Sequence, residues 1–311
     1  MSQAAPYEGI VILGVPRSGT TLLRRLLQAH PNIACPPETN LLSAASRFLD
    51  EQRFAGGLSV GVVPGLHFSG VSEDVVLARF REFLFSFWRD IAARADKGRW
   101  AEKTAVDVFH IDAIERLCGA RCRYVALFRH PLDVVCSLKE LSDKMERHLP
   151  EIYEYVQRHP STYEALAEAW RDGNTRLLRF ADAHPEWVVR VRYEDLTRDP
   201  VGELTRILGF LDEPTDVPQL LESLGRAEAV GLGDWKTYAR AEISAASVGR
   251  HRTLSPWTVE QLVPIVSDLM ERLGYEPLRA RKADVDSQRW AELSRQVTGM
   301  KLSSTQPRRE V

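Results

Sequence analysis

The stretch that decides the fold is Ile10-Val11-Ile12-Leu13-Gly14-Val15-Pro16-Arg17-Ser18-Gly19-Thr20-Thr21. Its first four residues form a short apolar run, which is typical of a buried parallel strand. A turn with glycine and proline follows, and a helix is expected to begin near Thr20. Free backbone N–H groups and the dipole at the N-terminus of such a helix favour a phosphate-like anion. The stretch therefore predicts a strand, an anion-binding loop and a helix in succession.

The glycine spacing of this loop nearly matches the Walker A pattern of nucleotide triphosphatases, with one departure. Thr20 stands where those proteins carry lysine, and the cation of the loop is instead Arg17. We therefore expect the loop to bind an anion other than Mg-ATP. A P-loop small-molecule kinase remains an alternative, which the missing lysine and the lack of a clear magnesium-binding acid disfavour.

Length and composition are those of an ordinary globular protein. The 311 residues are 44% hydrophobic and 27% charged, which suits one large α/β domain. The formal net charge is −2, so the basic excess typical of nucleic-acid-binding proteins is missing. No apolar run is long enough for a signal peptide or a membrane span, and we expect a cytoplasmic protein. Its cysteines form no CxxC pair, which predicts reduced thiols rather than a zinc site.

Short apolar strands alternate with longer helical patterns along the chain. This predicts an α/β, P-loop-like three-layer fold with a central parallel sheet flanked by helices. Strands are expected at 10–13, 123–127 and 187–191, and helices at 21–29, 74–95, 106–118, 132–147, 163–182, 200–211 and 256–273. Pro264 is expected to kink or end the last helix. The glycine-rich stretch 54–70 is expected to be a loop that lines or covers a site.

The chain is expected to divide into two parts of very different character. Residues 1–279 carry the alternating strand and helix patterns and are predicted to form one domain. Residues 280–311 turn polar and are predicted to be a C-terminal extension that is partly disordered.

A second anion-binding segment begins where the apolar run before Arg129 ends. Arg129 is expected at the carboxyl end of a strand, where α/β sheets bind ligands. Pro131 suits the start of a helix, and Ser137 lies about two turns along that helix. An arginine and a hydroxyl facing one cleft can bind a second phosphate, although an arginine at a strand end is more often structural. Two anion sites at one sheet edge indicate a nucleotide with phosphates at both ends.

These segments resemble the PAPS-dependent sulfotransferases, which transfer a sulfonate from 3'-phosphoadenosine 5'-phosphosulfate (PAPS) to a hydroxyl or amine. The first resembles the family's 5'-phosphosulfate loop, and the second resembles its 3'-phosphate element. Two further matches follow in the same order, at 192–200 and in the basic loop 248–252. Together the four matches cover roughly residues 9–275. The pattern is similar to the bacterial type of the family and to its tyrosylprotein, carbohydrate and polyketide-associated groups.

The resemblance implies which residues hold PAPS and its product PAP. They are Arg17, Ser18, Gly19, Thr20, Thr21, Arg129, Ser137, Tyr193, Arg250, His251 and Arg252. Tyr193 is equally compatible with a core tyrosine whose hydroxyl is satisfied within the protein. Many family members carry lysine at the position of Arg17. Because arginine almost never donates a proton at neutral pH, we expect Arg17 to act as a fixed charge on the departing phosphate. The scheme requires no metal.

Glu38 is the predicted base that takes the proton of the acceptor hydroxyl. Its context resembles the glutamate-bearing segment of the tyrosylprotein group, and the alternative is that it caps a helix starting near Asn40. Lys103 is predicted to stabilise the transferring sulfonate, since catalysis here rests on positioning and charge. The alternative for Lys103 is a surface ion pair with Glu102 or Asp107.

Several other residues are weaker candidates. His110 is a rival base but reads more simply as an ordinary helix histidine, and His130 is expected only to pack beside the phosphate site. His251 is expected to contact either the nucleotide or the acceptor. The stretch 231–238 is predicted to be a mobile lid whose acceptor contacts are Trp235, Lys236 and Tyr238.

The acceptor is the least determined part of the reading. The lack of a secretory signal favours an intracellular hydroxyl compound, which is a small metabolite, a lipid, a glycoside or a β-hydroxyacyl chain on an acyl carrier protein. A carrier partner predicts a basic patch beside the cleft, of which only 250–252 and 279–282 give a hint. A non-catalytic nucleotide-binding protein is the remaining alternative, and the sequence indicates no oligomeric state.

Overall fold

The computed structural model describes residues 7–223 and 243–278 of the chain. At its centre lies a five-stranded sheet in the order β2-β5-β1-β6-β7, in which every neighbouring pair is parallel. The strands are β1 (Gly9–Leu13), β2 (Ile33–Ala34), β5 (Arg99–Glu102), β6 (Cys122–Phe128) and β7 (Val188–Arg192). The predicted α/β fold with a central parallel sheet is therefore confirmed.

The central strand β1 is apolar along its length because helices cover both faces of the sheet. All five of its residues are buried. Val11 and Leu13 enter the hydrophobic core on one face, while Ile10 and Ile12 enter a second core on the other. Alternate side chains of a strand point to opposite faces, so each core receives every second residue. Each such burial contributes about 1.5–3 kcal/mol to folding.

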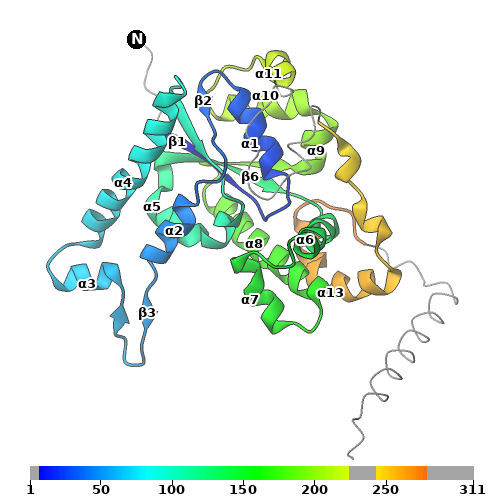
Figure 1. Ribbon diagram of the computed structural model, residues 1–311, viewed down its shortest axis with the longest axis horizontal. Coiled ribbons are helices and arrows are strands. Elements are labelled where there is room, and N and C mark those ends of the chain that lie inside the picture. Colours follow the sequence, from blue (N-terminus) through cyan, green and yellow to red (C-terminus); the bar gives the residue numbers. More distant parts are fainter. Residues whose placement is uncertain (1–6, 224–242, 279–311) are drawn as a thin grey trace, which may run out of the picture.

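Two layers of helices enclose the sheet (Figure 1). One core is completed by α1 (Thr20–Ala29), α9 (Tyr193–Arg198), α10 (Pro200–Phe210) and α11 (Val217–Ser223). The other is completed by α2 (Leu41–Phe48), α4 (Glu73–Arg94), α5 (Ile111–Leu117), α6 (Pro131–Met145), α7 (Pro150–Arg158), α8 (Thr162–Ala183) and α13 (Pro256–Arg272). No helix within the described ranges is long and apolar enough to cross a bilayer.

The stretch 54–70 is not the loop that we expected. Strands β3 (Gln52–Arg53) and β4 (Ser59–Val60) pair antiparallel, and α3 (Val62–Phe68) follows them. Gly56 and Gly57 make the hairpin turn with φ angles of 94° and 87°, a conformation that glycine adopts without strain. Together these elements project from the body of the molecule in Figure 1. The loop expectation was wrong because the glycines belong to a hairpin.

The last described helix continues past Pro264, so the expectation that this proline ends the helix was wrong, while the alternative of a kink stays a prediction. Ser255 caps α13 by accepting a hydrogen bond from the backbone N–H of Thr258 at 3.0 Å. Pro264 lies inside the helix without ending it. The apolar face of α13, which includes Leu262 and Val266, is buried in the core. Packing of this face therefore outweighs the cost of about 3 kcal/mol that an interior proline imposes.

Other boundaries differ only in detail. The helix expected at 106–118 is divided into a 3₁₀ turn, Ala105–His110, and helix α5. Three more short 3₁₀ turns lie at Gly119–Arg121, Ala245–Ser247 and Arg250–Thr253. The predicted lid at 231–238 and the predicted extension at 280–311 lie outside the described residues, and the division of the chain into these two parts stays a prediction.

Candidate functional site

The carboxyl ends of the five central strands lie at one edge of the sheet because all five run parallel. A predicted site residue follows each end: Arg17 after β1, Glu38 after β2, Lys103 after β5, Arg129 after β6 and Tyr193 after β7. Open α/β sheets bind ligands at this edge, where the connections leave the sheet in opposite directions. The topology thus gathers residues that are far apart in the sequence.

The loop between β1 and α1 folds tightly around its glycine. The N–H of Ser18 donates to the carbonyl of Val15 at 3.0 Å. Gly19 is the N-cap of α1 with φ 99°, and no described side chain caps this helix, which leaves its first turn suited to an anion. A Cβ on Gly19 would lie 2.3 Å from Cδ2 of Tyr193. Glycine is therefore required both by the backbone angle and by the tyrosine ring.

Arg129 connects the two predicted phosphate elements. Its side chain is buried, and its Nη1 donates to the carbonyl of Arg17 at 2.8 Å. Its Nη2 donates to the carbonyl of Ser247 at 2.5 Å, and its guanidinium lies over the ring of Tyr193 at 4.3 Å. Burial lowers the pKa of Arg129, although an arginine in a protein remains charged at neutral pH. Tyr193 thus serves as a platform for the cation.

The site also contains buried polar atoms suited to a ligand. Ser137, on α6, accepts a hydrogen bond from Nε of Arg17 at 3.0 Å. The hydroxyl of Ser18 and Nε of Arg129 are buried and have no hydrogen-bond partner among the described residues. Buried polar groups normally find a partner, so these two atoms fit a site that a polar ligand completes. With the open first turn of α1, the arrangement fits the phosphates of a nucleotide.

Asp133, at the start of α6, holds the late basic loop. Its carboxylate accepts from the backbone N–H groups of Gly249 at 2.7 Å and His251 at 2.9 Å, and from Nδ1 of His251 at 2.7 Å. Burial alone would raise the pKa of Asp133, but these hydrogen bonds lower it to about 2. The sequence analysis missed Asp133. Its position in the first turn of a helix is a signal for capping, whereas a partner 116 residues away leaves no sequence signal.

The histidines take structural positions around this loop. The rings of His130 and His251 stack with centroids 4.3 Å apart. With Asp133 they form a group whose ligand atoms are close enough to share a metal ion, although the carboxylate already accepts three hydrogen bonds. Burial, reinforced by the nearby His251, lowers the pKa of His130 to about 4. His110 pairs with Glu151 at 3.5 Å and does not line the pocket described below.

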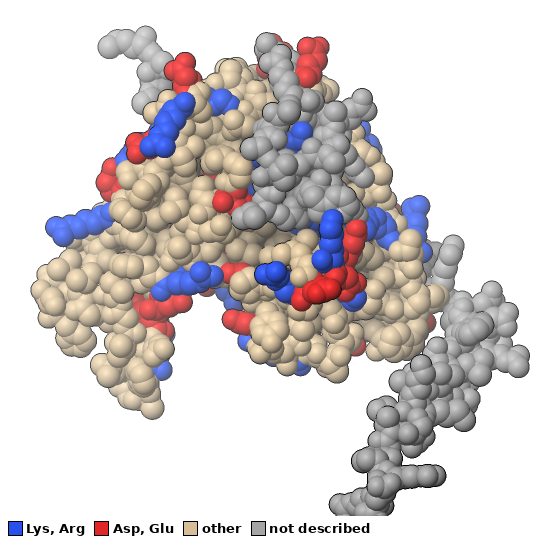
Figure 2. Space-filling model, viewed as in Figure 1, with Lys and Arg blue, Asp and Glu red and all other residues tan. Residues whose placement is uncertain are grey.

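The other basic residues of the late loop face outward. Arg250 pairs with Glu140 on α6, and Arg252 is exposed. On the face shown in Figure 2, charged side chains of both signs are interspersed and neither sign covers a broad area. Of the two segments that hinted at a basic patch for a carrier protein, 250–252 lies in this late loop and 279–282 lies outside the described residues.

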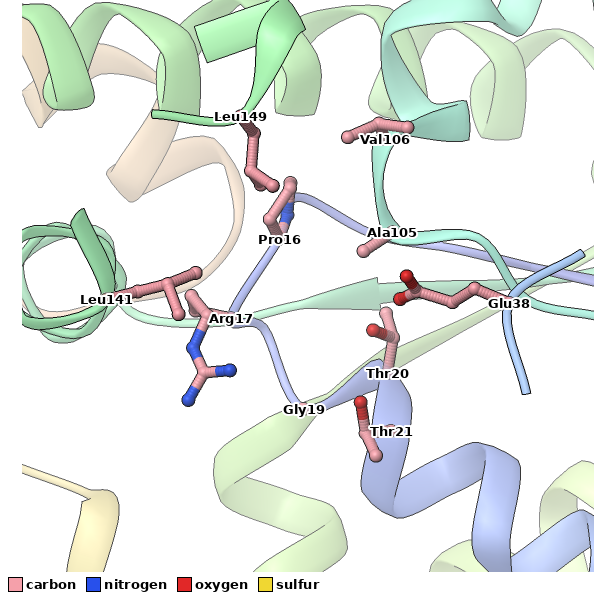
Figure 3. Close-up of a pocket in the computed structure, with 10 residues that line it drawn as sticks. All are labelled: Pro16, Arg17, Gly19, Thr20, Thr21, Glu38, Ala105, Val106, Leu141 and Leu149. Atoms are coloured by element: carbon pink, nitrogen blue, oxygen red, sulfur yellow. The ribbon is translucent and has the colours of Figure 1, made fainter. Parts of the chain in front are cut away.

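A pocket opens beside the first loop and combines two kinds of wall (Figure 3). The polar wall consists of Arg17, Thr20, Thr21 and Glu38, and the apolar wall of Pro16, Ala105, Val106, Leu141 and Leu149. In Figure 3 the carboxylate of Glu38 points toward Thr20 and Ala105. The predicted base therefore faces the anion-binding loop across the pocket.

Lys103 is buried behind Glu38. Its side chain is 2% exposed, and its Nζ lies 2.6 Å from Oε1 of Glu38, whose side chain is 21% exposed. The alternative of a surface lysine is therefore excluded. Glu38 does not cap the helix that follows it, because the N-cap of α2 is Asn40 and the N–H of Leu41 at its start donates to the hydroxyl of Thr39 at 3.3 Å.

Two more carboxylates lie behind this pair. Glu102 and Asp107 are both fully buried, and burial raises the pKa of each, that of Asp107 well above its ordinary value. A hydroxyl of Ser43 donates to Asp107 at 2.8 Å. The sequence suggested both carboxylates only as ion-pair partners of Lys103, whereas the structure places them beneath the pocket.

Comparison with known proteins identifies the family. The model described as the sulfotransferase family matches residues 9–217, which include both anion-binding segments, Glu38 and Lys103. The chain belongs to the sulfotransferase family. The resemblance to the sulfotransferases stated from the sequence is thereby confirmed. The P-loop kinase alternative finds no support in this match.

Two curated relatives illustrate the range of the match. The chain is 29% identical over 279 residues to the nodulation protein NoeE of Sinorhizobium fredii, covering 85% of this chain and 65% of that protein. It is 24% identical over 278 residues to protein-tyrosine sulfotransferase 1 of Danio rerio, covering 86% of this chain and 72% of that protein. The chain thus spans less than two thirds of the length of NoeE.

Solved structures of sulfotransferase domains share the fold. The domain from the curacin biosynthetic pathway is 21% identical with a TM-score of 0.58, covering 88% of this chain and all of that domain. The domain from the Synechococcus PCC 7002 olefin synthase is 23% identical with a TM-score of 0.59, covering 89% of this chain and 98% of that domain. Both likenesses confirm the sulfotransferase fold.

Proposed function

We propose that this sulfotransferase moves a sulfonate from PAPS to a hydroxyl of its acceptor, with Glu38 as the base. One observation carries the proposal: the loop of a nucleotide-type anion site and Glu38, which pairs with the buried Lys103, line the same pocket. Membership of the sulfotransferase family supports the donor. A binding protein without catalysis would have no need to bury a lysine against a carboxylate beside that site.

The donor site is assigned from the contacts at the sheet edge. Arg17 and the N–H groups at the start of α1 would hold the 5'-phosphate. Arg129 and Ser137 would hold the 3'-phosphate, with the late loop that Asp133 anchors closing over it. A bound phosphate would give the unpartnered Nε of Arg129 an acceptor.

The transfer is an in-line displacement at sulfur. The acceptor oxygen forms a bond to sulfur while the bond from sulfur to the 5'-phosphate oxygen breaks. The hydroxyl proton passes to the carboxylate of Glu38, and the bonding electron pair leaves with the phosphate of PAP. Lys103 would meet the sulfonate oxygens and Arg17 the departing phosphate, so that fixed cations meet charge where it develops. These steps need no metal ion.

The apolar wall supports one class of acceptor. Five apolar residues line the pocket together with Glu38, and Ala105 lies next to its carboxylate (Figure 3). A hydroxyl borne on an apolar carbon framework suits this wall better than a glycoside, whose other hydroxyls would lose hydrogen bonds to water on entering it. A lipid and a hydroxyacyl chain on an acyl carrier protein both meet this description.

A thermal-shift titration tests the nucleotide assignment. PAP without magnesium should raise the melting temperature of the wild type and not that of Arg129→Ala, because a ligand of the native state alone stabilises it. Stabilisation by Mg-ATP but not by PAP would instead support the alternative of a P-loop small-molecule kinase. Radiolabelled transfer from PAPS to a panel of alcohols and glycosides then tests catalysis. PAP binding with no transfer to any acceptor would leave a nucleotide-binding protein.

A further inference from the structure

Glu102 lies beneath the proposed catalytic pair and outside the pocket. It is the last residue of β5, its side chain is fully buried, and it does not line the pocket. Three donors converge on its carboxylate: the hydroxyl of Thr39 at 2.6 Å, Nε1 of Trp88 at 2.8 Å and the hydroxyl of Thr104 at 2.8 Å. A carboxylate with three donors is held in one orientation.

The directions of these hydrogen bonds follow from the groups involved. An indole N–H can only donate, so Trp88 donates to Glu102. The hydroxyl of Thr104 accepts from the backbone N–H of Asn40 at 3.0 Å and has its own hydrogen left for Glu102. Such charge-assisted hydrogen bonds to an ionised carboxylate are stronger than those between neutral groups. They offset the cost of burial that raises the pKa of Glu102.

The same contacts determine where Glu38 lies. Thr39, the residue after Glu38, is tied to Glu102 directly, and Asn40 is tied to it through Thr104. Lys103, which pairs with Glu38, is the next residue after Glu102 in the chain. Glu102 is therefore connected to both partners of the ion pair.

A rigid support lies on the other side of Glu102. The ring of Trp88, on α4, is fully buried. It stacks on the ring of Trp100, which lies on β5 with Glu102, and the two centroids are 4.7 Å apart. The hydrogen bond from Trp88 thus fixes Glu102 to the core, whereas the two threonine bonds lead to the Glu38 loop. These hydrogen bonds therefore connect the Glu38 loop to the hydrophobic core.

We propose that Glu102 is a positioning residue for sulfonate transfer. It holds Glu38 where the acceptor proton is taken and Lys103 where the sulfonate oxygens arrive. The inference rests on the proposed function of this site. A displacement of about 1 Å in such an arrangement lowers a rate by roughly 100-fold, so a residue that touches no substrate can still control turnover.

The test compares Glu102→Gln with two matched variants. Glu102→Gln keeps the shape of the side chain and loses its charge and one acceptor oxygen. Thr39→Val removes the hydroxyl that ties the loop, and Trp88→Phe removes the bond to the core together with part of the buried indole ring. We expect Glu102→Gln and Thr39→Val each to lower kcat by about 10- to 100-fold while KM for PAPS changes by less than about 3-fold. Trp88→Phe should lower the melting temperature, and it should also lower kcat, but by less than Glu102→Gln, because both threonine bonds of Glu102 remain.

The double variant Glu102→Gln/Thr39→Val gives the sharper result. If both changes break one connection, its kcat should equal that of the worse single variant rather than the product of the two effects. Multiplying effects, or a Glu102→Gln variant with wild-type kcat and a lowered melting temperature, would overturn the inference and leave Glu102 a residue of the core.

A binding measurement separates this inference from the proposed function. Glu102→Gln should reduce the ratio of PAPS to PAP affinity measured by calorimetry, because only PAPS carries the sulfonate that Lys103 meets. An unchanged ratio in the variant would overturn the inference alone. A wild-type chain that binds neither nucleotide would overturn the proposed function together with the inference.

Discussion

Nζ of Lys103 lies 2.6 Å from Oε1 of Glu38, and the two residues follow neighbouring parallel strands, β5 and β2. The two side chains differ in exposure to solvent: that of Lys103 is 2% exposed and that of Glu38 is 21% exposed. Glu38 thus reaches the pocket while its partner stays behind it.

Removal of the base should abolish most turnover without affecting the nucleotide. General-base catalysis contributes typically about 10²- to 10⁴-fold, so Glu38→Gln should lower kcat within that range. Stabilisation by PAP should stay at the wild-type level, because Glu38 is not among the residues assigned to the nucleotide. Steady-state transfer from PAPS measures kcat, and a thermal-shift titration measures the stabilisation by PAP. A kcat within about 3-fold of wild type would assign the base to another residue.

Breaking the ion pair from its two sides should have unequal effects on stability. Glu38→Ala leaves the ammonium of Lys103 buried without its partner, a situation that typically costs about 3–5 kcal/mol. Lys103→Met leaves the partly exposed carboxylate of Glu38, which water can reach, and should cost less. Urea unfolding of the two variants measures the difference. Equal losses would mean that Lys103 finds another partner in the variant.

The glycine that begins α1 should not tolerate a methyl group. Gly19→Ala places a Cβ in the ring of Tyr193 and forces alanine to φ 99°, so we expect loss of PAP binding. Gly56→Ala is a matched control, since its φ is 94° and nothing lies within 4 Å of the added Cβ. The control should cost only backbone strain of about 1 kcal/mol or more and keep PAP binding. Equal PAP affinity in both variants would contradict the close approach of Tyr193.

His130 should make the protein less stable as the pH falls. Burial and the nearby His251 lower its pKa from 6.5 to about 4, so the folded state binds its proton less readily than the unfolded state. Its contribution to stability is complete above about pH 6.5 and is lost progressively as the pH falls to about 4. His130→Phe keeps an aromatic ring and should flatten the fall in melting temperature over this range. Parallel pH profiles for the variant and the wild type would assign the dependence to other groups.

The sequence predicted the parts of the site that depend on local pattern. A strand followed by a glycine-containing turn and a helix is recognisable from consecutive residues, which is why the loop at Arg17 and the segment at Arg129 were both found. The order of the strands could not be read in this way. Nothing local says that β5 inserts between β1 and β2, and only that insertion brings Lys103 to Glu38.

The connections that hold the site together were missed for the same reason. Asp133 reaches a loop 116 residues away, and Glu102 binds a threonine 63 residues earlier in the chain. A carboxylate in either position reads from the sequence as an ordinary helix cap or ion-pair partner. Pro264 shows the converse, because a strong local signal for a break was overridden by packing of the surrounding helix.

The strand order of the sheet separates two groups of site residues. In the proposed function, the residues assigned to the nucleotide, Arg17, Arg129 and Tyr193, follow β1, β6 and β7, whereas Glu38 and Lys103 follow β2 and β5. Under the proposed function, mutations in the loops after β2 and β5 can therefore reshape one part of the pocket while the residues assigned to the nucleotide stay intact. Such a chain can acquire new acceptors in evolution, or by design, while it keeps the same sulfonate donor.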